Sequence, residues 1–291
     1  MYKKNGIVQA DPAVVLDFTR NIIMNHLWDT HMHTSFSGDS EADPEAMIRE
    51  AVRLGLSGIC ITDHEDLDYP DPDICFELDL PVYEQTILDL KKKYAGKIPV
   101  CFGIELGLAP HLTERHRQIL SSHPFDFVIG SSHLVNGIDP YYPAYYEGRS
   151  EEEAYREYFR SVLANIQAFQ DFDVYGHLDY VVRYGPDKNR FYSYERYADV
   201  IDPILMELIR LGKGIEVNTA GFKYGLGHPN PTEAILCRYR ELGGTILTLG
   251  ADAHAPEQIA WSYASLPGLL KDCGFDSYTV FQNRKPIFLP L

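Results

Sequence analysis

The chain has 291 residues, of which 45% are hydrophobic and 23% are charged, and its formal net charge is −16. This composition is typical of a globular protein with a substantial core. So acidic a chain is a poor partner for nucleic acid, because phosphate contacts need a basic surface. No apolar run has the length of a membrane-spanning helix. Residues 1–6 lead into polar sequence without the apolar core of a signal peptide, so we expect a cytoplasmic protein with no membrane contact.

Short β-branched runs alternate with amphipathic segments along the chain. The first predicted helix is the clearest, because Asp43 can cap it, Pro44 can open it and Gly55 can end it. Strands are predicted to end near His31, Thr62, Glu105, Ser131, His177, Asn218 and Gly250, and helices over residues 44–54, 82–95, 151–169, 196–211, 231–242 and 256–270. About seven strand–helix units without a linker favour one parallel α/β barrel over an open sheet. We therefore expect residues 1–291 to form a single domain.

The five cysteines give no sign of a disulfide framework. They are odd in number, far apart and without a Cys-x-x-Cys pair: Cys60, Cys75, Cys101, Cys237 and Cys273. Cys60 and Cys101 lie within apolar runs, which predicts buried free thiols.

Histidines and acids follow the predicted strands in an unusual series. In the segment His31-Met32-His33, residues i and i+2 of an extended strand point to the same face, so both imidazoles can reach one cation. Later strand ends supply further nitrogen and oxygen ligands of the kind that zinc and similar ions accept. The nine candidate ligands are His31, His33, Asp39, His64, Glu105, His133, His177, Asp252 and His254. Nine ligands are too many for one ion and suit two or three, with Glu105 as a bridging carboxylate.

Each of these histidines taken alone could be a strand-end residue bonded to backbone, but six such coincidences favour a metal centre. The remaining five histidines lack this context and are predicted to be structural: His26, His111, His116, His123 and His228. Asp63 and Asp179, which lie close to His64 and His177 in sequence, are predicted to orient metal ligands.

Two basic residues and one aromatic segment are candidates for substrate contact. Arg183 follows His177 closely and Lys223 follows the next predicted strand, so either could bind phosphate; the alternative is a solvated surface charge. Residues 141–197 hold 12 of the chain's 20 tyrosines. These tyrosines either pack a lid or interface, or contact the substrate.

The ordered motifs identify a family resemblance. His31-Met32-His33, Thr62-Asp63-His64, Gly103-Ile104-Glu105, Ser131-Ser132-His133, His177-Leu178-Asp179 and Asp252-Ala253-His254 together resemble the polymerase and histidinol phosphatase (PHP) family of metal-dependent phosphoesterases. The resemblance extends from about residue 27 to residue 270. Phe36-Ser37-Gly38-Asp39-Ser40 and the aromatic stretch 139–149 resemble the histidinol-phosphatase branch.

The resemblance implies a distorted TIM-like barrel of seven β/α units with three divalent metal ions at the C-terminal ends of the strands. One metal would be held by His31, His33, Glu105 and Asp252; Glu105 would bridge to a second metal bound by His133 and His177; and a third would be held by Asp39, His64 and His254. Asp39 departs from family members that have histidine at that position. This departure leaves zinc, iron and manganese all open.

The implied activity is hydrolysis of L-histidinol phosphate to L-histidinol and phosphate, a step of histidine biosynthesis. A water bridging two metals has a lowered pKa and would attack phosphorus as hydroxide. The catalytic candidates are Glu105, Asp252 and Arg183, and the candidate phosphate anchors are Arg183 and Lys223. The expected partner is a small phosphoester, and the oligomeric state stays open.

Three other functions remain open. The first is a phosphoesterase of the same family acting on a nucleotide or phosphotyrosine. The second is a metal-binding regulatory module. The third is a barrel of the amidohydrolase type, which also opens with His-x-His but usually carries a lysine where this chain has Glu105.

Overall fold

A computed structural model describes residues 26–291 and contains a nearly closed barrel of parallel strands. Seven strands lie side by side in the order β1 (Trp28–Asp29), β2 (Gly58–Ile61), β4 (Val100–Gly107), β5 (Phe127–Ser131), β6 (Val174–Tyr175), β7 (Gly214–Asn218) and β8 (Leu247–Gly250). A short strand, β3 (His64–Glu65), follows β2 and also pairs with β4. The barrel closes where Thr30 N donates to Leu249 O at 2.9 Å and Met32 forms a parallel bridge with Ala253. The predicted barrel is confirmed.

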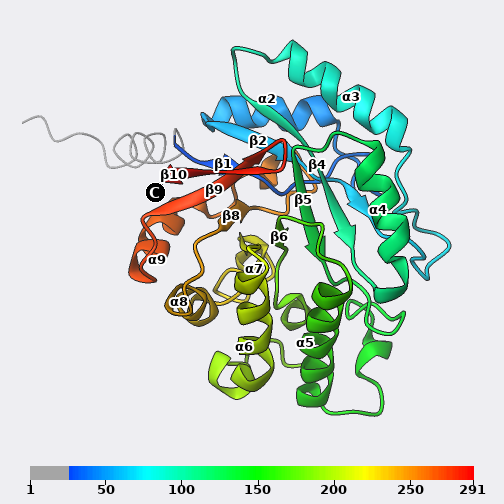
Figure 1. Cartoon of the computed structure of the whole chain (residues 1–291), viewed down its shortest axis with the longest axis vertical. Coiled ribbons are helices and arrows are strands. Elements are labelled where there is room, and N and C mark those ends of the chain that lie inside the picture. The colour runs from blue at the N-terminus through cyan, green and yellow to red at the C-terminus, as the bar shows by residue number, and fades with distance from the viewer. Residues whose placement is uncertain (1–25) are drawn as a thin grey trace, which may run out of the picture.

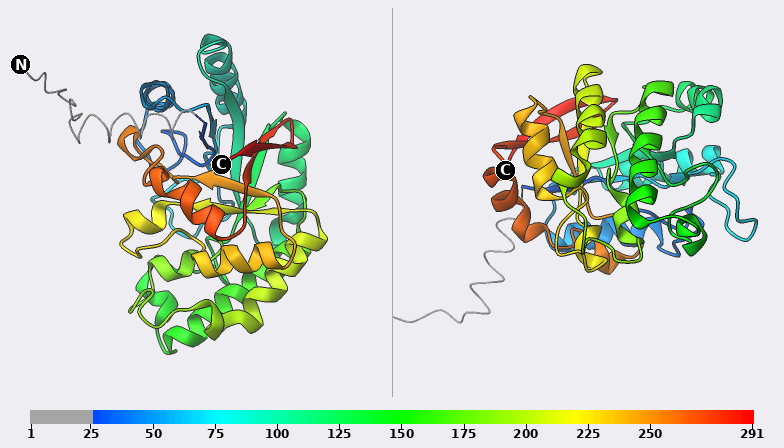
Figure 2. Two further views of the ribbon diagram at one scale, coloured as in Figure 1. Left: turned by 90° about the vertical axis from the view of Figure 1, so that its left-hand side faces the viewer. Right: turned by 90° about the horizontal axis from the view of Figure 1, so that it is seen from below.

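The strands form the core of the molecule. All eight residues of β4 and all five of β7 are buried, as expected for parallel strands covered on both faces. The helices lie outside the strands (Figures 1 and 2). They are α2 (Pro44–Leu54), α3 (Leu80–Lys93), α4 (Thr113–Ser122), α5 (Glu151–Ala168), α6 (Tyr194–Arg210), α7 (Ala220–Lys223), α8 (Glu233–Glu241) and α9 (Leu266–Asp272).

Five of the six predicted helices are found close to their predicted bounds. In α2 the Asp43 side chain accepts from Ala46 N, Pro44 is the first residue, and Gly55 ends the helix with a φ of 75°. The sixth prediction, one helix over 256–270, is wrong. Ala260 and Ser262 have positive φ angles of 52° and 58°, which break the segment into two 3₁₀ turns before α9 begins.

Several elements were not predicted. They include the short elements β3 and α7, the helix α4, and the antiparallel hairpin of β9 (Ser277–Gln282) and β10 (Lys285–Pro290), the red ribbon in Figure 1. The hairpin packs at the N-terminal ends of the strands, where Arg284 N donates to Asp126 O and the rings of Phe281 and Phe127 stack at 5.2 Å. It therefore covers the end of the barrel opposite to the predicted metal centre.

The prediction for the cysteines is partly wrong. Cys60 and Cys101 are buried free thiols as predicted, but Cys237 and Cys273 form a disulfide. These two residues are 36 positions apart in sequence, yet their Cα atoms lie 4.4 Å apart because α8 and the end of α9 are neighbours. The spacing of cysteines in the sequence carries no sign of that contact.

Within residues 26–291, no helix is long and apolar enough to cross a membrane. The expectation about a signal peptide concerns residues that lie outside the described part of the chain.

Candidate metal centre and its cavity

The two histidines after β1 face the same side of the chain, as their spacing predicts. Their Nε2 atoms lie 3.1 Å apart, while Met32 between them is fully buried in the core. Asp252, which follows β8, comes beside them because its backbone N–H donates to His31 O at 2.9 Å. Its Oδ1 lies 3.4 Å from His33 Nε2. Closure of the barrel thus joins the first and last parts of the site.

Glu105 lies between two groups of histidines and turns one oxygen toward each. Its Oε2 is 3.2 Å from His31 Nε2 and 3.5 Å from His33 Nε2. Its Oε1 is 2.9 Å from His177 Nε2 and 3.4 Å from His133 Nε2. These two histidines are themselves 3.4 Å apart through their Nε2 atoms. Each oxygen of one carboxylate is therefore placed to serve a separate cation.

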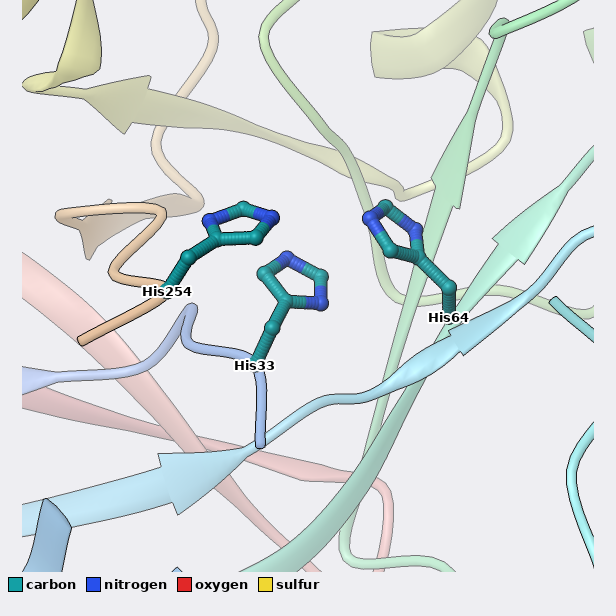
Figure 3. Close-up of side chains that lie close together, drawn as sticks. All are labelled: His33, His64 and His254. Carbon is teal, nitrogen blue, oxygen red and sulfur yellow. The ribbon is translucent and has the colours of Figure 1, made fainter. Parts of the chain in front are cut away.

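A third group lies toward the mouth. Asp39 Oδ2 is 3.1 Å from His254 Nε2 and 3.7 Å from His64 Nε2. The ring of His33 stacks on His64 at 4.0 Å and lies 4.3 Å from His254, so the three imidazoles converge from three separate segments (Figure 3). All nine predicted residues thus meet in one place. We call them the ligand cluster.

The donor atoms of the ligand cluster fit bound cations. Atoms coordinated at ~2.1 Å in a tetrahedral site lie about 3.4 Å from one another. The nitrogen and oxygen atoms of each group have this spacing, and four triads of the cluster could each hold an ion. Glu105 Oε2 and His64 Nδ1 are buried and lie 3.0 Å apart, yet neither forms a hydrogen bond of good geometry with any described residue. Such buried orphan atoms are costly unless something else binds them, and a cation would do so.

Electrostatics differ among the residues of the ligand cluster. Burial opposes the charged forms of His31, His64 and His133, but nearby carboxylates outweigh it and raise the pKa values of these three imidazoles. Burial and the neighbouring His64 and His254 rings hold the pKa of His33 well below its usual range. Burial opposes a charged Glu105, but His31, His133 and His64 outweigh it and hold the pKa of the carboxyl well below its usual range. A neutral imidazole beside an ionised carboxylate is the form in which both bind metals.

Two buried carboxylates that the sequence analysis missed orient the ligand histidines. Glu216 Oε1 accepts from His31 Nδ1 at 2.6 Å, and Asp66 Oδ1 accepts from His133 Nδ1 at 2.9 Å. Such contacts fix the ring so that Nε2 faces the metal. Each carboxylate occupies the space that a Cβ would take at a neighbouring glycine, Gly250 for Glu216 and Gly107 for Asp66. An acid in the middle of the apolar strand Gly214–Asn218 was the signal available for Glu216.

Of the two acids predicted to orient metal ligands, Asp63 acts through a hydroxyl group, and the prediction is wrong for Asp179. Asp63 accepts from Ser37 Oγ at 2.7 Å, and that hydroxyl lies 3.3 Å from His33 Nδ1. Asp179 does not contact His177; it accepts from Asn230 Nδ2 at 2.6 Å, and Asn230 in turn accepts from Arg183 Nε at 2.9 Å. Asp179 therefore supports the guanidinium rather than a histidine.

The ligand cluster opens into a cavity of about 250 Å³. Arg183 lines this cavity and is buried, so the alternative of a solvated surface charge is wrong for it. Its NH1 donates to Asp252 Oδ2 at 2.8 Å and its NH2 to Asn218 Oδ1 at 2.8 Å. Three of its five N–H groups donate to Asp252, Asn218 and Asn230, so two remain for a ligand.

Lys223 is half-buried and lies outside the described lining of the cavity. It donates to Asp252 O and Gln258 Oε1 at 3.1 and 2.9 Å.

The tyrosine-rich segment contains buried tyrosines and tyrosines that line the cavity. Tyr145, Tyr155 and Tyr158 are buried and pack in the core. Other tyrosines line the same cavity as the ligand cluster, and two of them come from outside residues 141–197. We call these the tyrosine wall: Tyr69, Tyr141, Tyr142, Tyr180, Tyr184 and Tyr224.

The five histidines predicted to be structural lie outside every group of the described residues that could hold a metal. His123 Nδ1 lies 2.7 Å from Glu84 Oε2, and His116 is buried in contact with Phe169. A larger cavity of about 540 Å³ lies beside Asp66, between residues 107–112 and α5, and none of the ligand cluster lines it.

Comparisons with known proteins identify relatives of this chain. The PHP domain model matches residues 29–220. A histidinol-phosphatase from Lactococcus lactis is 34% identical over 88% of this chain and 95% of its own length. A crystal structure of a histidinol phosphate phosphatase from the same organism, complexed with zinc, L-histidinol and phosphate, superimposes with a TM-score of 0.84 at 33% identity, covering 90% of this chain and 99% of that one. A structure from Listeria monocytogenes shares the fold, with a TM-score of 0.72 at 23% identity over 82% of this chain and 99% of that one. The chain therefore belongs to the PHP-domain family.

Proposed function

We propose that this protein is a metal-dependent phosphatase that hydrolyses L-histidinol phosphate to L-histidinol and phosphate, a step of histidine biosynthesis. The observation that carries the proposal is Glu105, whose two oxygens face separate sets of histidines, among them His177, which lines the same cavity as Arg183. The similar Lactococcus protein, whose structure holds zinc, L-histidinol and phosphate, supports the choice of substrate. Because the ligand cluster draws on strands from β1 to β8, we propose the whole barrel as one catalytic domain.

The donor set supports three divalent cations. His31, His33, Glu105 and Asp252 would hold one, Glu105 with His133 and His177 a second, and Asp39 with His64 and His254 a third. Zinc is the ion in the Lactococcus structure, and imidazole with carboxylate also suits iron and manganese. Such cations lower the pKa of coordinated water and neutralise charge on phosphoryl oxygens.

Residues around the ligand cluster would position the phosphate and keep the carboxylate ligands ionised. The remaining N–H groups of Arg183 would bind phosphoryl oxygens, since a guanidinium fork matches phosphate geometry. Burial opposes a charged Asp252, but Arg183 and His31 outweigh it and hold the pKa of the carboxyl well below its usual range. Asp252 is therefore set up to bind cations as an anion. Asn218 and Asn230 fix the guanidinium from the other side.

A substrate panel with metal analysis tests the proposal. The protein is purified without chelator, its metal content is measured, and kcat/KM is determined for L-histidinol phosphate, a nucleoside monophosphate, phosphotyrosine and p-nitrophenyl phosphate. We expect more than one tightly held transition metal per chain. We also expect L-histidinol phosphate to lead the panel by roughly 100-fold or more, about 2.7 kcal/mol of transition-state binding.

The outcomes separate the alternatives. If another ester leads the panel, the phosphatase class stands and the substrate is wrong. If the protein holds fewer than two metals and cleaves no ester, the catalytic proposal fails and a regulatory metal-binding module is the better description.

A further inference from the structure

The cavity has an acidic, aromatic side that the ligand cluster does not explain. Four aspartates line it, and Arg183 is the one lysine or arginine among the described lining residues. Asp39 and Asp252 belong to the ligand cluster, and Asp66 accepts from His133. Arg183 is already paired with Asp252. Asp139 is therefore the lining carboxylate that neither belongs to the ligand cluster nor pairs with a histidine, lysine or arginine among the described residues.

Neutral donors hold Asp139 in place. Its Oδ2 accepts from Tyr69 OH at 2.9 Å, and its Oδ1 accepts from Tyr141 N at 2.8 Å and from Tyr180 OH at 3.3 Å. The side chain is only 5% exposed. Burial raises the pKa of this carboxyl, with the hydrogen bond from Tyr141 N opposing the rise. Hydrogen bonds from hydroxyl and amide groups orient a carboxylate but do not neutralise it, so a cationic ligand would gain by binding here.

Aromatic side chains lie next to this carboxylate in the cavity lining, where the hydroxyls of Tyr69 and Tyr180 donate to it. Tyr141 meets Tyr142 at 5.1 Å and Tyr184 at 5.2 Å, in both cases edge to face. Tyr184 continues the wall to Tyr180 at 5.0 Å and Tyr224 at 5.5 Å. Ring faces beside a carboxylate are the usual receptor for an ammonium group.

The position of Asp139 relates this receptor to the reacting phosphate. Tyr180, which donates to Asp139, also packs its ring against His133 at 5.5 Å and His177 at 5.1 Å. One tyrosine thus separates the carboxylate from the ligand cluster. With phosphate at the cluster, the alcohol portion of a small ester would extend toward Asp139. A volume of about 250 Å³ leaves room for a small alcohol only.

We propose that Asp139 and the tyrosine wall form a receptor for the ammonium group of the alcohol, so that the enzyme selects phosphate monoesters of small amino alcohols. The inference rests on the proposed function for the phosphate end of the site. It adds that selectivity depends on a charge that the metal centre does not use. Asp139 is the specificity-determining residue, and the rings hold the remainder of the alcohol.

Paired substrates and paired variants test the inference on the metal-loaded enzyme. L-Histidinol phosphate is compared with imidazolylpropyl phosphate, the same ester without its amino group. We expect loss of the amino group to lower kcat/KM about tenfold or more in the wild type, which is ~1.4 kcal/mol. In Asp139→Asn this ratio should collapse toward one. In the matched control Asp71→Asn the ratio should persist, because Asp71 also accepts a tyrosine hydroxyl, from Tyr142 at 3.0 Å, but does not line the cavity.

The comparison of the two esters on the wild type needs no variant, so it tests the ammonium receptor even if Asp139→Asn does not fold. An equal kcat/KM for the two esters, or a ratio that Asp139→Asn leaves intact, would overturn the inference while the phosphatase proposal stands. Calorimetric measurement of L-histidinol binding tests the opposite case, in which the ammonium receptor exists but the protein is not a phosphatase. If the wild type cleaves no ester but binds L-histidinol, and Asp139→Asn weakens that binding about tenfold, the receptor stands and the proposed function fails. If neither cleavage nor L-histidinol binding occurs, both are wrong.

Discussion

The two sides of the cavity are built in different ways. Most of the ligand cluster lies at or just after strand ends, where the parallel register places the residues: His64 is directly opposite Glu105, and Glu105 is opposite Ile129. Asp39 is the exception, in the loop between β1 and α2. The tyrosine wall comes from loops and short turns, and hydrogen bonds between loops hold it in place, as from Tyr69 to Asp139. Strand ends give a rigid constellation suited to chemistry, whereas loops can change their side chains without disturbing the barrel. This difference indicates that the ligand cluster determines which reaction the protein catalyses and that the tyrosine wall determines which substrate it accepts.

The largest effect that this comparison predicts is at Glu105. Glu105→Gln keeps the size of the side chain but removes the charge that faces both sets of histidines. We expect kcat/KM to fall by more than ~100-fold for every ester, beyond what loss of a supporting group costs, with reduced metal content. Elemental analysis and steady-state kinetics check this. The control is Glu114→Gln, an exposed glutamate of α4 paired with Arg117. Full metal content and wild-type rates in Glu105→Gln would show that Glu105 is not a metal ligand.

A smaller effect is expected where a carboxylate acts through a histidine. Glu216→Gln leaves every residue of the ligand cluster present but weakens the contact that fixes His31. The expected loss is about 10–100-fold in metal affinity or activity, with KM nearly constant, because Glu216 does not line the cavity. Metal titration and the KM-against-kcat split measure it. A change confined to KM would mean that Glu216 contacts the substrate instead.

The same comparison explains what the sequence could predict. His31 and His33 were readable because alternation along a strand is a local rule, and each later ligand follows its own apolar run. Glu216 and Asp66 were not recognised, because their roles depend on which neighbouring strand has a glycine at the contact point. Tyr69 lies outside the tyrosine-rich segment, and its contact with Asp139 spans 70 residues. Pairings between loops and the bond between Cys237 and Cys273 depend on tertiary packing that no local pattern encodes.

Arg183 lies between the ligand cluster and the tyrosine wall. Its substitution tests whether it binds the phosphate or selects the alcohol. Arg183→Lys keeps the charge but loses the planar fork that joins Asp252, Asn218 and Asn230. Loss of one charge-assisted hydrogen bond to phosphate, ~1.5 kcal/mol or more, predicts about a tenfold fall in kcat/KM. The fall should be similar for esters with and without an amino group, because phosphate is common to both. Arg210→Lys on the surface of α6 is the matched control. A fall in kcat/KM for the amino ester alone would mean that Arg183 contributes to selection of the alcohol, as the tyrosine wall does.

The smallest predicted effect is at Tyr69, and it tests whether the wall acts through Asp139. Tyr69→Phe retains the ring and removes one neutral hydrogen bond to the carboxylate, about 1 kcal/mol or roughly fivefold. That loss should affect kcat/KM for L-histidinol phosphate and spare imidazolylpropyl phosphate, because only the former has an ammonium group for Asp139. Tyr142→Phe is the matched comparison, since its hydroxyl donates to Asp71 rather than Asp139, and its effect on the ratio of the two esters should be smaller. Equal effects from the two variants would mean that the rings, and not the orientation of Asp139, are what the wall contributes to selectivity.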